Sequence, residues 1–213
     1  MSETRKRAKP TIAPAPTSLD PHAIEAVAHA SHGDPFSVLG PHQTGQGLWE
    51  IRAMLPQAHA ARLVSVDGER TLASMQRLHV GGLFVAQIES QLRPSYRFEV
   101  EGRGPRLLYD AYAFGPVLGD KDLHALSGGE DPFVHFGAHF LTHEGVRGAN
   151  FVVWAPNARR VSVVGDWNDW DGRRHPMRLR HDAGVWELFI PELQPEARYK
   201  FEIVGPGGEL LPL

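Results

Sequence analysis

The sequence predicts an all-β protein made of two tandem copies of one β module, each a sandwich or barrel. Short apolar runs recur along the chain with Gly and Pro turns between them. The 213 residues include 22 glycines and 17 prolines without a fixed period, which favours many turns and excludes a collagen-like repeat. Motifs of the first half return in the second half in the same order, which indicates an internal duplication.

The N-terminal segment, residues 1–18, is expected to be a solvated, disordered tail. Its basic residues are followed by alternating Ala and Pro and not by the apolar run of a signal peptide. These basic residues are Arg5, Lys6, Arg7 and Lys9. A basic patch that binds an anionic partner is the alternative interpretation.

A short helix is expected directly after the tail. Asp20 suits the N-cap and Pro21 the first turn. Gly33 is expected to end the helix. One weakly apolar face is formed by Ile24, Val27 and Ala28. Because this face is short, the helix should lie on a larger body.

Residues 19–115 are expected to form the first module with this helix, and residues 131–213 the second module. The expected strands cover residues 63–66, 83–88 and 96–100 in the first module and residues 151–153, 161–164, 185–190 and 199–204 in the second. A linker over residues 116–130 carries a helical turn from Asp120 to Leu126.

Four matched motifs support the duplication, each separated by roughly 100 residues. The pairs are Asp34–His42 with Asp131–His139, Pro56 with Pro156, Gly82–Phe84 with Gly184–Trp186, and Tyr96–Glu99 with Tyr199–Glu202. By the same offset, the counterpart of Tyr109–Phe114 would fall beyond Leu213. We therefore expect the second module to be incomplete and the chain to be a fragment.

Composition excludes several classes of function. The chain has no cysteine, which excludes a disulfide scaffold, thiolate metal sites and a cysteine nucleophile. A net charge of −3 gives no basic field for nucleic acid, and no apolar stretch is long enough for a membrane span. We expect a cytoplasmic protein without a nucleic-acid or membrane partner.

No catalytic residue, metal ligand or cofactor site is predicted. Glycoside hydrolysis needs two carboxylates across a sugar-sized cleft. The acidic residues that we considered, Asp67, Asp120, Asp122 and Glu144, fall in expected turns. His135 and His139 are four residues apart, but His139 matches His42 in the other copy, which favours a structural role over metal binding.

Two tryptophans in the turn-rich segment Gly165–Gly172 are the candidate site. Trp167 and Trp170 could stack on the apolar face of a pyranose while Asn168 and nearby Asp residues bond its hydroxyl groups. The alternative is that one tryptophan fills the sandwich and the other packs on a neighbouring domain. We favour the core role for Trp167, and for Trp170 both interpretations stay open.

At these residues the chain resembles a known family. The segments Phe151–Ala158, Val161–Met177, Gly184–Pro191 and Tyr199–Phe201 resemble the family 48 carbohydrate-binding module of bacterial glycogen branching enzymes. His32–His42 resembles the additional N-terminal module of the same enzymes. The resemblance covers about residues 19–213.

The resemblance implies two immunoglobulin-like sandwiches that bind or position α-glucan, such as glycogen or amylose. The parent protein would be a 1,4-α-glucan branching enzyme of glycoside hydrolase family 13, with a retaining, two-carboxylate catalytic barrel after Leu213 as a further partner. Trp170 and Lys200 match glucan-contacting positions of the family. The aromatic residue expected near the module's end is missing from Gly207–Leu213, which weakens the case for a full site.

Two other functions remain as alternatives. One is a free-standing glucan-binding or scaffold module that recruits a separate enzyme. The expected incompleteness of the second module argues against it. The other is a tandem immunoglobulin-like adhesion protein, against which the lack of a secretion signal argues.

Overall fold

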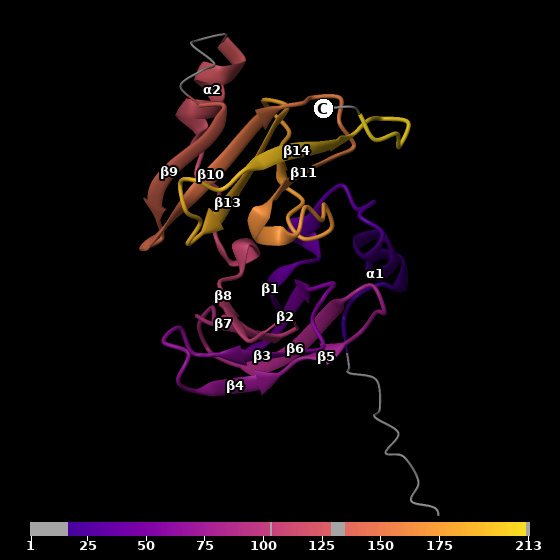
Figure 1. Cartoon of the computed structure of the whole chain (residues 1–213), viewed down its shortest axis with the longest axis vertical. Coiled ribbons are helices and arrows are strands. Elements are labelled where there is room, and N and C mark those ends of the chain that lie inside the picture. The colour runs from indigo at the N-terminus through magenta and orange to yellow at the C-terminus, as the bar shows by residue number, and fades with distance from the viewer. Residues whose placement is uncertain (1–16, 103, 129–134, 212–213) are drawn as a thin grey trace, which may run out of the picture.

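The structure, a computed structural model, describes residues 17–102, 104–128 and 135–211. Figure 1 shows two bodies built of strands, one from each half of the chain, with a helix beside the second body. Every sheet is antiparallel in the part of the chain that the structure describes. The predicted all-β class is therefore confirmed.

The first module packs two four-stranded sheets face to face. Their orders are β1-β2-β6-β5 and β4-β3-β7-β8. The elements are α1 (Pro21–Ala28), η1 (Pro35–Ser37), β1 (Gly40–Gly45), β2 (Leu48–Met54), β3 (Ala60–Val64), β4 (Thr71–Ser74), β5 (Gln76–Arg77), β6 (Leu83–Glu89), β7 (Arg97–Glu101) and β8 (Arg106–Leu108). Buried Ile51, Leu63, Phe84 and Phe98 lie in the core between the sheets.

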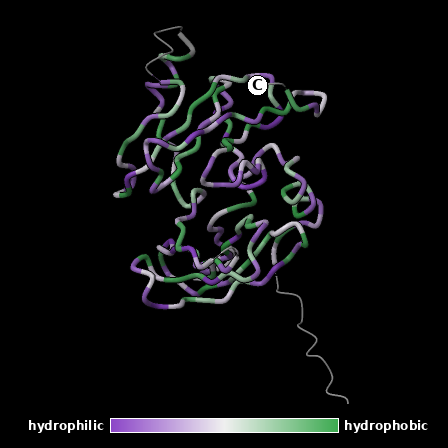
Figure 2. The backbone as a smooth tube through the Cα atoms, viewed as in Figure 1, coloured by the Kyte–Doolittle hydropathy of each residue, from purple (hydrophilic) through white to green (hydrophobic). Residues whose placement is uncertain are grey.

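The second module repeats this plan with a four-stranded sheet, β12-β13-β10-β9, and a two-stranded sheet, β11-β14. Its elements are β9 (Gly137–His143), β10 (Val146–Trp154), β11 (Arg160–Gly165), η4 (Asp166–Asn168), β12 (Arg178–Arg180), β13 (Val185–Pro191) and β14 (Tyr199–Val204). Phe151, Trp186 and Leu188 fill the space between the sheets. Figure 2 shows hydrophobic segments on the strands of both modules, as two buried cores require.

The duplication extends to individual hydrogen bonds. The Nε2 atom of His42 bonds to the Leu39 carbonyl at 3.0 Å, and that of His139 to the Phe136 carbonyl at 3.1 Å. Both imidazoles therefore fix the entry into the first strand of their module, which is the structural role that the repeat favoured. Within the described residues, no group of three metal-ligating side chains is present.

Matching geometry also appears at the end of the second strand of each copy. The amide of Leu55 donates to the Gly82 carbonyl at 2.7 Å, and that of Ala155 to the Gly184 carbonyl at 3.1 Å. Both glycines have positive φ, at 102° and 63°. The matched Gly and Pro motifs thus mark one shared turn.

The N-terminal helix begins as predicted but ends earlier than predicted. Asp20 caps it as expected, accepting from the His22 amide at 2.7 Å. The helix ends at Ala28 and the chain turns through Ala30 at φ 53°, before Gly33 is reached. Upstream, Thr17 and Ser18, which we placed in the solvated tail, are hydrogen-bonded to the first module. Their hydroxyl and amide groups donate to the buried Glu50 carboxylate at 2.7 and 3.1 Å. The remainder of the tail lies outside the described residues.

The segment expected to be a linker packs on the second module. It follows η2 (Ala111–Ala113), which ends the first module, and it contains α2 (Asp120–Gly128), which confirms the expected helical turn. The amides of Val117 and Leu118 each donate to buried Glu187 at 3.0 Å. Leu118 and Leu123 cluster with Val152 on the outer face of the four-stranded sheet. Residues 117–123 therefore cover the outer face of the four-stranded sheet.

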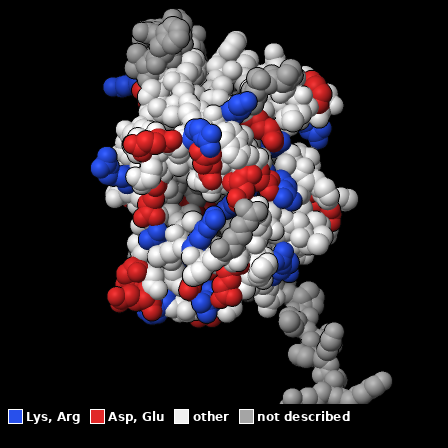
Figure 3. Space-filling view, in the orientation of Figure 1, with Lys and Arg blue, Asp and Glu red and all other residues white. Residues whose placement is uncertain are grey.

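The two modules share one apolar cluster. It joins Leu39, Met54 and Tyr112 to Phe151 and Trp186. The Tyr112 hydroxyl donates to the Pro176 carbonyl at 3.0 Å. An ion pair between Arg97 and Glu192, at 2.6 Å, connects the modules a second time. Figure 3 shows Lys and Arg interspersed with Asp and Glu over one face of the molecule.

Candidate functional site

The candidate residues lie at one end of the two-stranded sheet of the second module. β11 ends at Gly165, and η4 follows directly. Asp169 and Trp170 then adopt φ values of 58° and 57°. Positive φ is uncommon for bulky residues, and such strain clusters at functional sites. Two such residues in succession reverse the chain, and the Trp170 amide closes the turn on the Gly165 carbonyl at 3.2 Å.

Trp167 faces the protein interior. Its ring stacks on Phe151 with centroids 5.6 Å apart and an interplanar angle of 23°. Its indole nitrogen is buried without a hydrogen-bond partner among the described residues. A side chain at Gly165 would collide with the Trp167 ring, which explains the glycine before this turn. The favoured interpretation of Trp167 as a core residue agrees with these contacts.

Asn168 is fully buried and holds the turn together. Its Oδ1 accepts from the Gly165 amide at 2.9 Å, and its Nδ2 donates to the Val163 carbonyl at 2.9 Å and to His175 Nδ1 at 2.8 Å. Because both amide atoms of the buried Asn168 side chain are hydrogen-bonded to protein groups, Asn168 cannot bond a sugar hydroxyl. The expectation that Asn168 contacts a ligand is corrected on this point.

Trp170 and Lys200 are the two candidates that face solvent. Trp170 is 42% exposed, and Lys200 is also exposed. Lys200 pairs with Val164 in the sheet, one residue before Gly165, on which the Trp170 turn closes. Tyr199 and Phe201, on either side of Lys200, point inward onto Phe151. The register therefore brings Trp170 and Lys200 to the same end of β11 and β14.

Ion pairs surround the Trp170 turn. Both oxygens of Asp166 bond the Arg198 guanidinium, at 3.1 to 3.2 Å. These hydrogen bonds hold the pKa of the Asp166 carboxyl below its usual range. Asp169 pairs with Arg174 at 2.9 Å, and Asp171 with Arg173 at 2.6 Å. The site thus offers an exposed aromatic face, one lysine and a fixed frame of paired charges.

The other acidic residues that we considered do not gather at a cleft: Asp67 and Glu144 lie in turns as expected, whereas Asp120 and Asp122 lie in the first turn of α2. Asp67 accepts from the Glu69 amide at 3.0 Å, Asp122 from the Gly119 amide at 2.8 Å and Glu144 from the Gly115 amide at 2.9 Å.

The described part of the chain has no helix that is long and apolar enough to cross a membrane.

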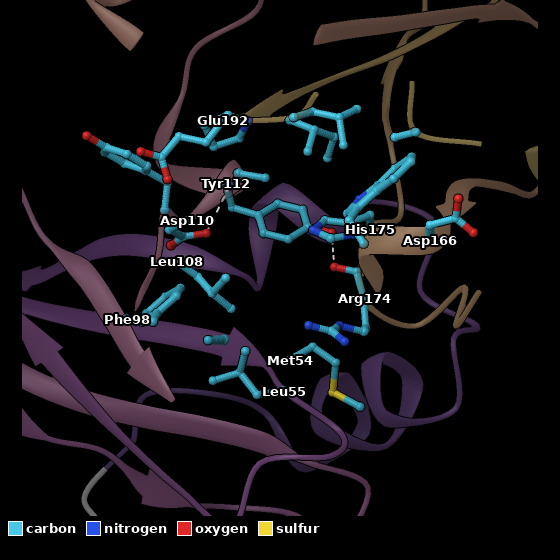
Figure 4. Close-up of a pocket in the computed structure, with 18 of the residues that line it drawn as sticks. Met54, Leu55, Phe98, Leu108, Asp110, Tyr112, Asp166, Arg174, His175 and Glu192 are labelled. Atoms are coloured by element: carbon cyan, nitrogen blue, oxygen red, sulfur yellow. Dashed lines mark hydrogen bonds between the residues drawn. The ribbon is translucent and has the colours of Figure 1, made fainter. Parts of the chain in front are cut away.

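A second feature, which the sequence did not reveal, lies between the modules. A cavity of about 480 Å³ is lined from one side by Asp110 and Tyr112 and from the other by Trp167 and His175. Figure 4 shows these two sides meeting around the Tyr112 ring. The only signal in the sequence was the aromatic segment Tyr109–Phe114 at the end of the first module.

Comparison with known proteins adds two family matches. Residues 20–112 match the N-terminal domain of alpha-1,4-glucan branching enzyme GlgB, and residues 135–212 match carbohydrate-binding module 48, the isoamylase N-terminal domain. A 1,4-alpha-glucan branching enzyme GlgB of Pseudomonas putida is 50% identical over 192 residues, which cover 89% of this chain and 26% of that protein. One from Paramagnetospirillum magneticum is 49% identical over 193 residues, covering 89% and 25%.

Similarity to solved structures is much weaker. A type I pullulanase from Bacillus subtilis, complexed with maltose, aligns with 81% of this chain and 24% of its own at a TM-score of 0.31 and 14% identity. That superposition is too loose to support an argument. The chain spans about a quarter of the length of the branching enzymes it matches.

Proposed function

Because the chain joins the N-terminal domain of the 1,4-alpha-glucan branching enzyme family to a carbohydrate-binding module 48, we propose that it is the glucan-binding accessory region of a glycogen branching enzyme. Such an enzyme cleaves an α-1,4-linked chain and transfers it to a 6-hydroxyl group. The reaction needs a carboxylate pair across a cleft. In this proposal that pair belongs to a catalytic barrel, which is a partner of the two modules in the parent enzyme.

The exposed Trp170 ring carries the proposal. An indole face stacks on the apolar face of a glucosyl ring, and an ammonium group such as that of Lys200 donates to hydroxyl oxygens. Trp170 adopts φ 57°, a conformation that is uncommon for a bulky residue. A glucan polymer such as glycogen or amylose is the ligand that we propose for this surface. A cytoplasmic location is part of the same proposal, and the lack of cysteine fits a reducing compartment.

Affinity electrophoresis in glycogen-containing gels tests the surface. We expect Trp170→Ala to weaken glycogen binding about two- to tenfold, since an aromatic contact contributes roughly 0.5–1.5 kcal/mol and tenfold corresponds to about 1.4 kcal/mol. Lys200→Ala should weaken binding by a smaller factor.

Trp154→Ala is the matched control. This tryptophan is 61% exposed but lies on β10, in the other sheet. The control variant should migrate like the unmodified chain. Equal retardation of the Trp170→Ala and unmodified proteins would exclude the Trp170 surface as the glucan site.

A further inference from the structure

The cavity between the modules has the dimensions of a small-molecule site. Its volume of about 480 Å³ lies within the range of roughly 300–1,000 Å³ that is usual for ligand pockets. The first module contributes the end of β2 and the connection from β8 to η2. The second contributes η4, residues 174–175 and the turn between β13 and β14. A molecule in this cavity would contact both modules at once.

The wall is apolar and rich in aromatic rings. Phe98, Tyr109, Tyr112 and Trp167 line it together with aliphatic side chains. The rings are held in place by the surrounding protein: Trp167 by its stack on Phe151, and Tyr112 by its bond to the Pro176 carbonyl. A preformed wall of this kind loses little conformational freedom when a ligand binds.

The charged groups of the lining already have partners. The pairs are Glu192 with Arg97, Arg174 with Asp169, Asp166 with Arg198, and Asp110 with the Tyr96 hydroxyl. A charged ligand would have to break one of these pairs to obtain a counter-charge. The cavity therefore favours a neutral ligand.

One fixed hydrogen-bond donor faces this neutral site. Because Asn168 Nδ2 donates to Nδ1 of His175, the imidazole must carry its proton on Nε2. Burial, followed by the charge of Arg174, lowers the pKa of His175 to about 3, so the ring stays neutral. Nε2 has no hydrogen-bond partner within the described ranges, and His175 as a whole is partly accessible. His175 lines the cavity beside the tip of Tyr112 (Figure 4).

We propose that this cavity binds the end of a neutral α-1,4-glucan chain, with glucosyl rings against the aromatic wall and one hydroxyl oxygen accepting from His175 Nε2. A pyranose presents an apolar face and a ring of neutral hydroxyl groups, which matches this wall and this donor. The inference rests on the proposed function for the choice of glucan. It adds a second glucan site, separate from the Trp170 surface and made by both modules together.

Titration of the ¹⁵N-labelled chain with maltotriose, followed by amide and indole signals, tests the second site. We expect saturable shifts at residues 109–112 and 190–197, and these shifts should persist in Trp170→Ala with a Kd within about twofold of the unmodified chain. In His175→Asn the new Oδ1 atom can still accept from Asn168, while the shorter side chain places no donor at the position of the imidazole Nε2. This variant should weaken the cavity response about tenfold, the factor that about 1.4 kcal/mol for one hydrogen bond gives.

A cavity-filling variant provides the matched comparison. Ala197→Trp introduces a ring into the lining, whereas Ala60→Trp places the same ring on an exposed position of β3. Only Ala197→Trp should abolish the cavity shifts, and both variants should keep the Trp170 response. Maltotriose that shifts Trp170 and leaves residues 109–112 and 190–197 unmoved would overturn the inference alone. No response at either place would reject the proposed function as well.

Discussion

Two buried titratable residues at the interface between the modules have pKa values shifted so that their neutral forms are favoured. Burial raises the pKa of Asp110 from 3.8 to about 6, against the hydrogen bonds from Tyr96 and the Tyr112 amide. Burial lowers the pKa of His175 from 6.5 to about 3. Each residue is therefore neutral in the folded protein over pH values at which it is charged in the unfolded chain.

These shifts act on stability with opposite signs. The folded protein binds a proton at Asp110 more tightly than the unfolded chain does, so the contribution of Asp110 is full below pH 3.8 and is lost as pH rises to about 6. At His175 the unfolded chain binds the proton more tightly, so stability falls as pH drops from 6.5 towards about 3. Between these limits the two effects oppose each other.

We predict that Asp110→Asn makes the protein steeply acid-sensitive. The amide oxygen of the new side chain can still accept from the Tyr112 amide, while the costly buried charge is gone. The free energy of unfolding at neutral pH should rise by roughly 1–3 kcal/mol and then fall faster than in the unmodified chain as the pH is lowered to about 4. Urea unfolding across this pH range measures the effect, and parallel profiles for the two proteins would contradict it.

At single residues the sequence could predict chemistry but not accessibility. Trp167, Asn168 and Trp170 are close together in one turn, and all three looked suited to a sugar. Only the fold distinguishes their roles. The Asn168 side-chain amide is hydrogen-bonded to the backbone of Gly165 and Val163, and the Trp167 ring stacks on Phe151. His175 was missed because its role depends on a tautomer that Asn168 selects.

Among the elements, most of the apolar inner strands could be predicted, but the inner strand β2 and several edge strands were not among the expected strands. Every apolar run that we assigned to a strand overlaps one, from β3 to β14. β1 and β9 were also missed because they are Gly-containing strands with interspersed polar residues, and both lie at sheet edges, where one neighbour suffices. The matched histidines within them were the available clue.

The shared turn gives a prediction about Gly82. This residue has φ 102°, and a Cβ atom there would lie 2.8 Å from the Leu55 carbonyl oxygen, which real Cβ contacts do not show. Gly145 also has positive φ, at 82°, but a Cβ there would meet no atom within 4 Å. Gly145→Ala should lower the free energy of unfolding by only roughly 1–2 kcal/mol, which is the cost of a left-handed backbone conformation for a residue with a Cβ atom.

Gly82→Ala should cost more, at least about 3 kcal/mol, because the overlap with the backbone forces the turn apart. Thermal and urea unfolding of the two variants side by side check the order. Equal losses would show that the turn relaxes around the added methyl group.

At the scale of the whole molecule, the shared apolar cluster predicts cooperative unfolding of both modules. Tyr112 belongs to the first module by sequence and packs on Phe36, yet its ring is part of the apolar cluster that both modules share, and its hydroxyl donates to the Pro176 carbonyl. We expect one calorimetric transition whose van't Hoff and calorimetric enthalpies agree. Tyr112→Ala should split it into two, since removing a buried aromatic ring costs about 3–5 kcal/mol. Tyr112→Phe, which keeps the ring, should retain a single transition.

Two transitions in the unmodified chain would show instead that the modules fold independently. The sequence could predict that there are two modules, from the repeat. It could not predict how tightly they join, because the joining contacts pair residues such as Arg97 and Glu192, which lie in different copies and have no common motif.

The near-identical strand registers of the two copies carry a risk during refolding. β3 pairs with β7 with Leu63 opposite Phe98, and β11 pairs with β14 with Val163 opposite Phe201. A collapsing chain therefore offers each of these strands two partners of almost the same shape, one native and one from the wrong copy. Exchange between copies, or between neighbouring molecules, would produce kinetic traps and swapped dimers that become more abundant with concentration. Dilute renaturation should thus recover more monomer than concentrated renaturation.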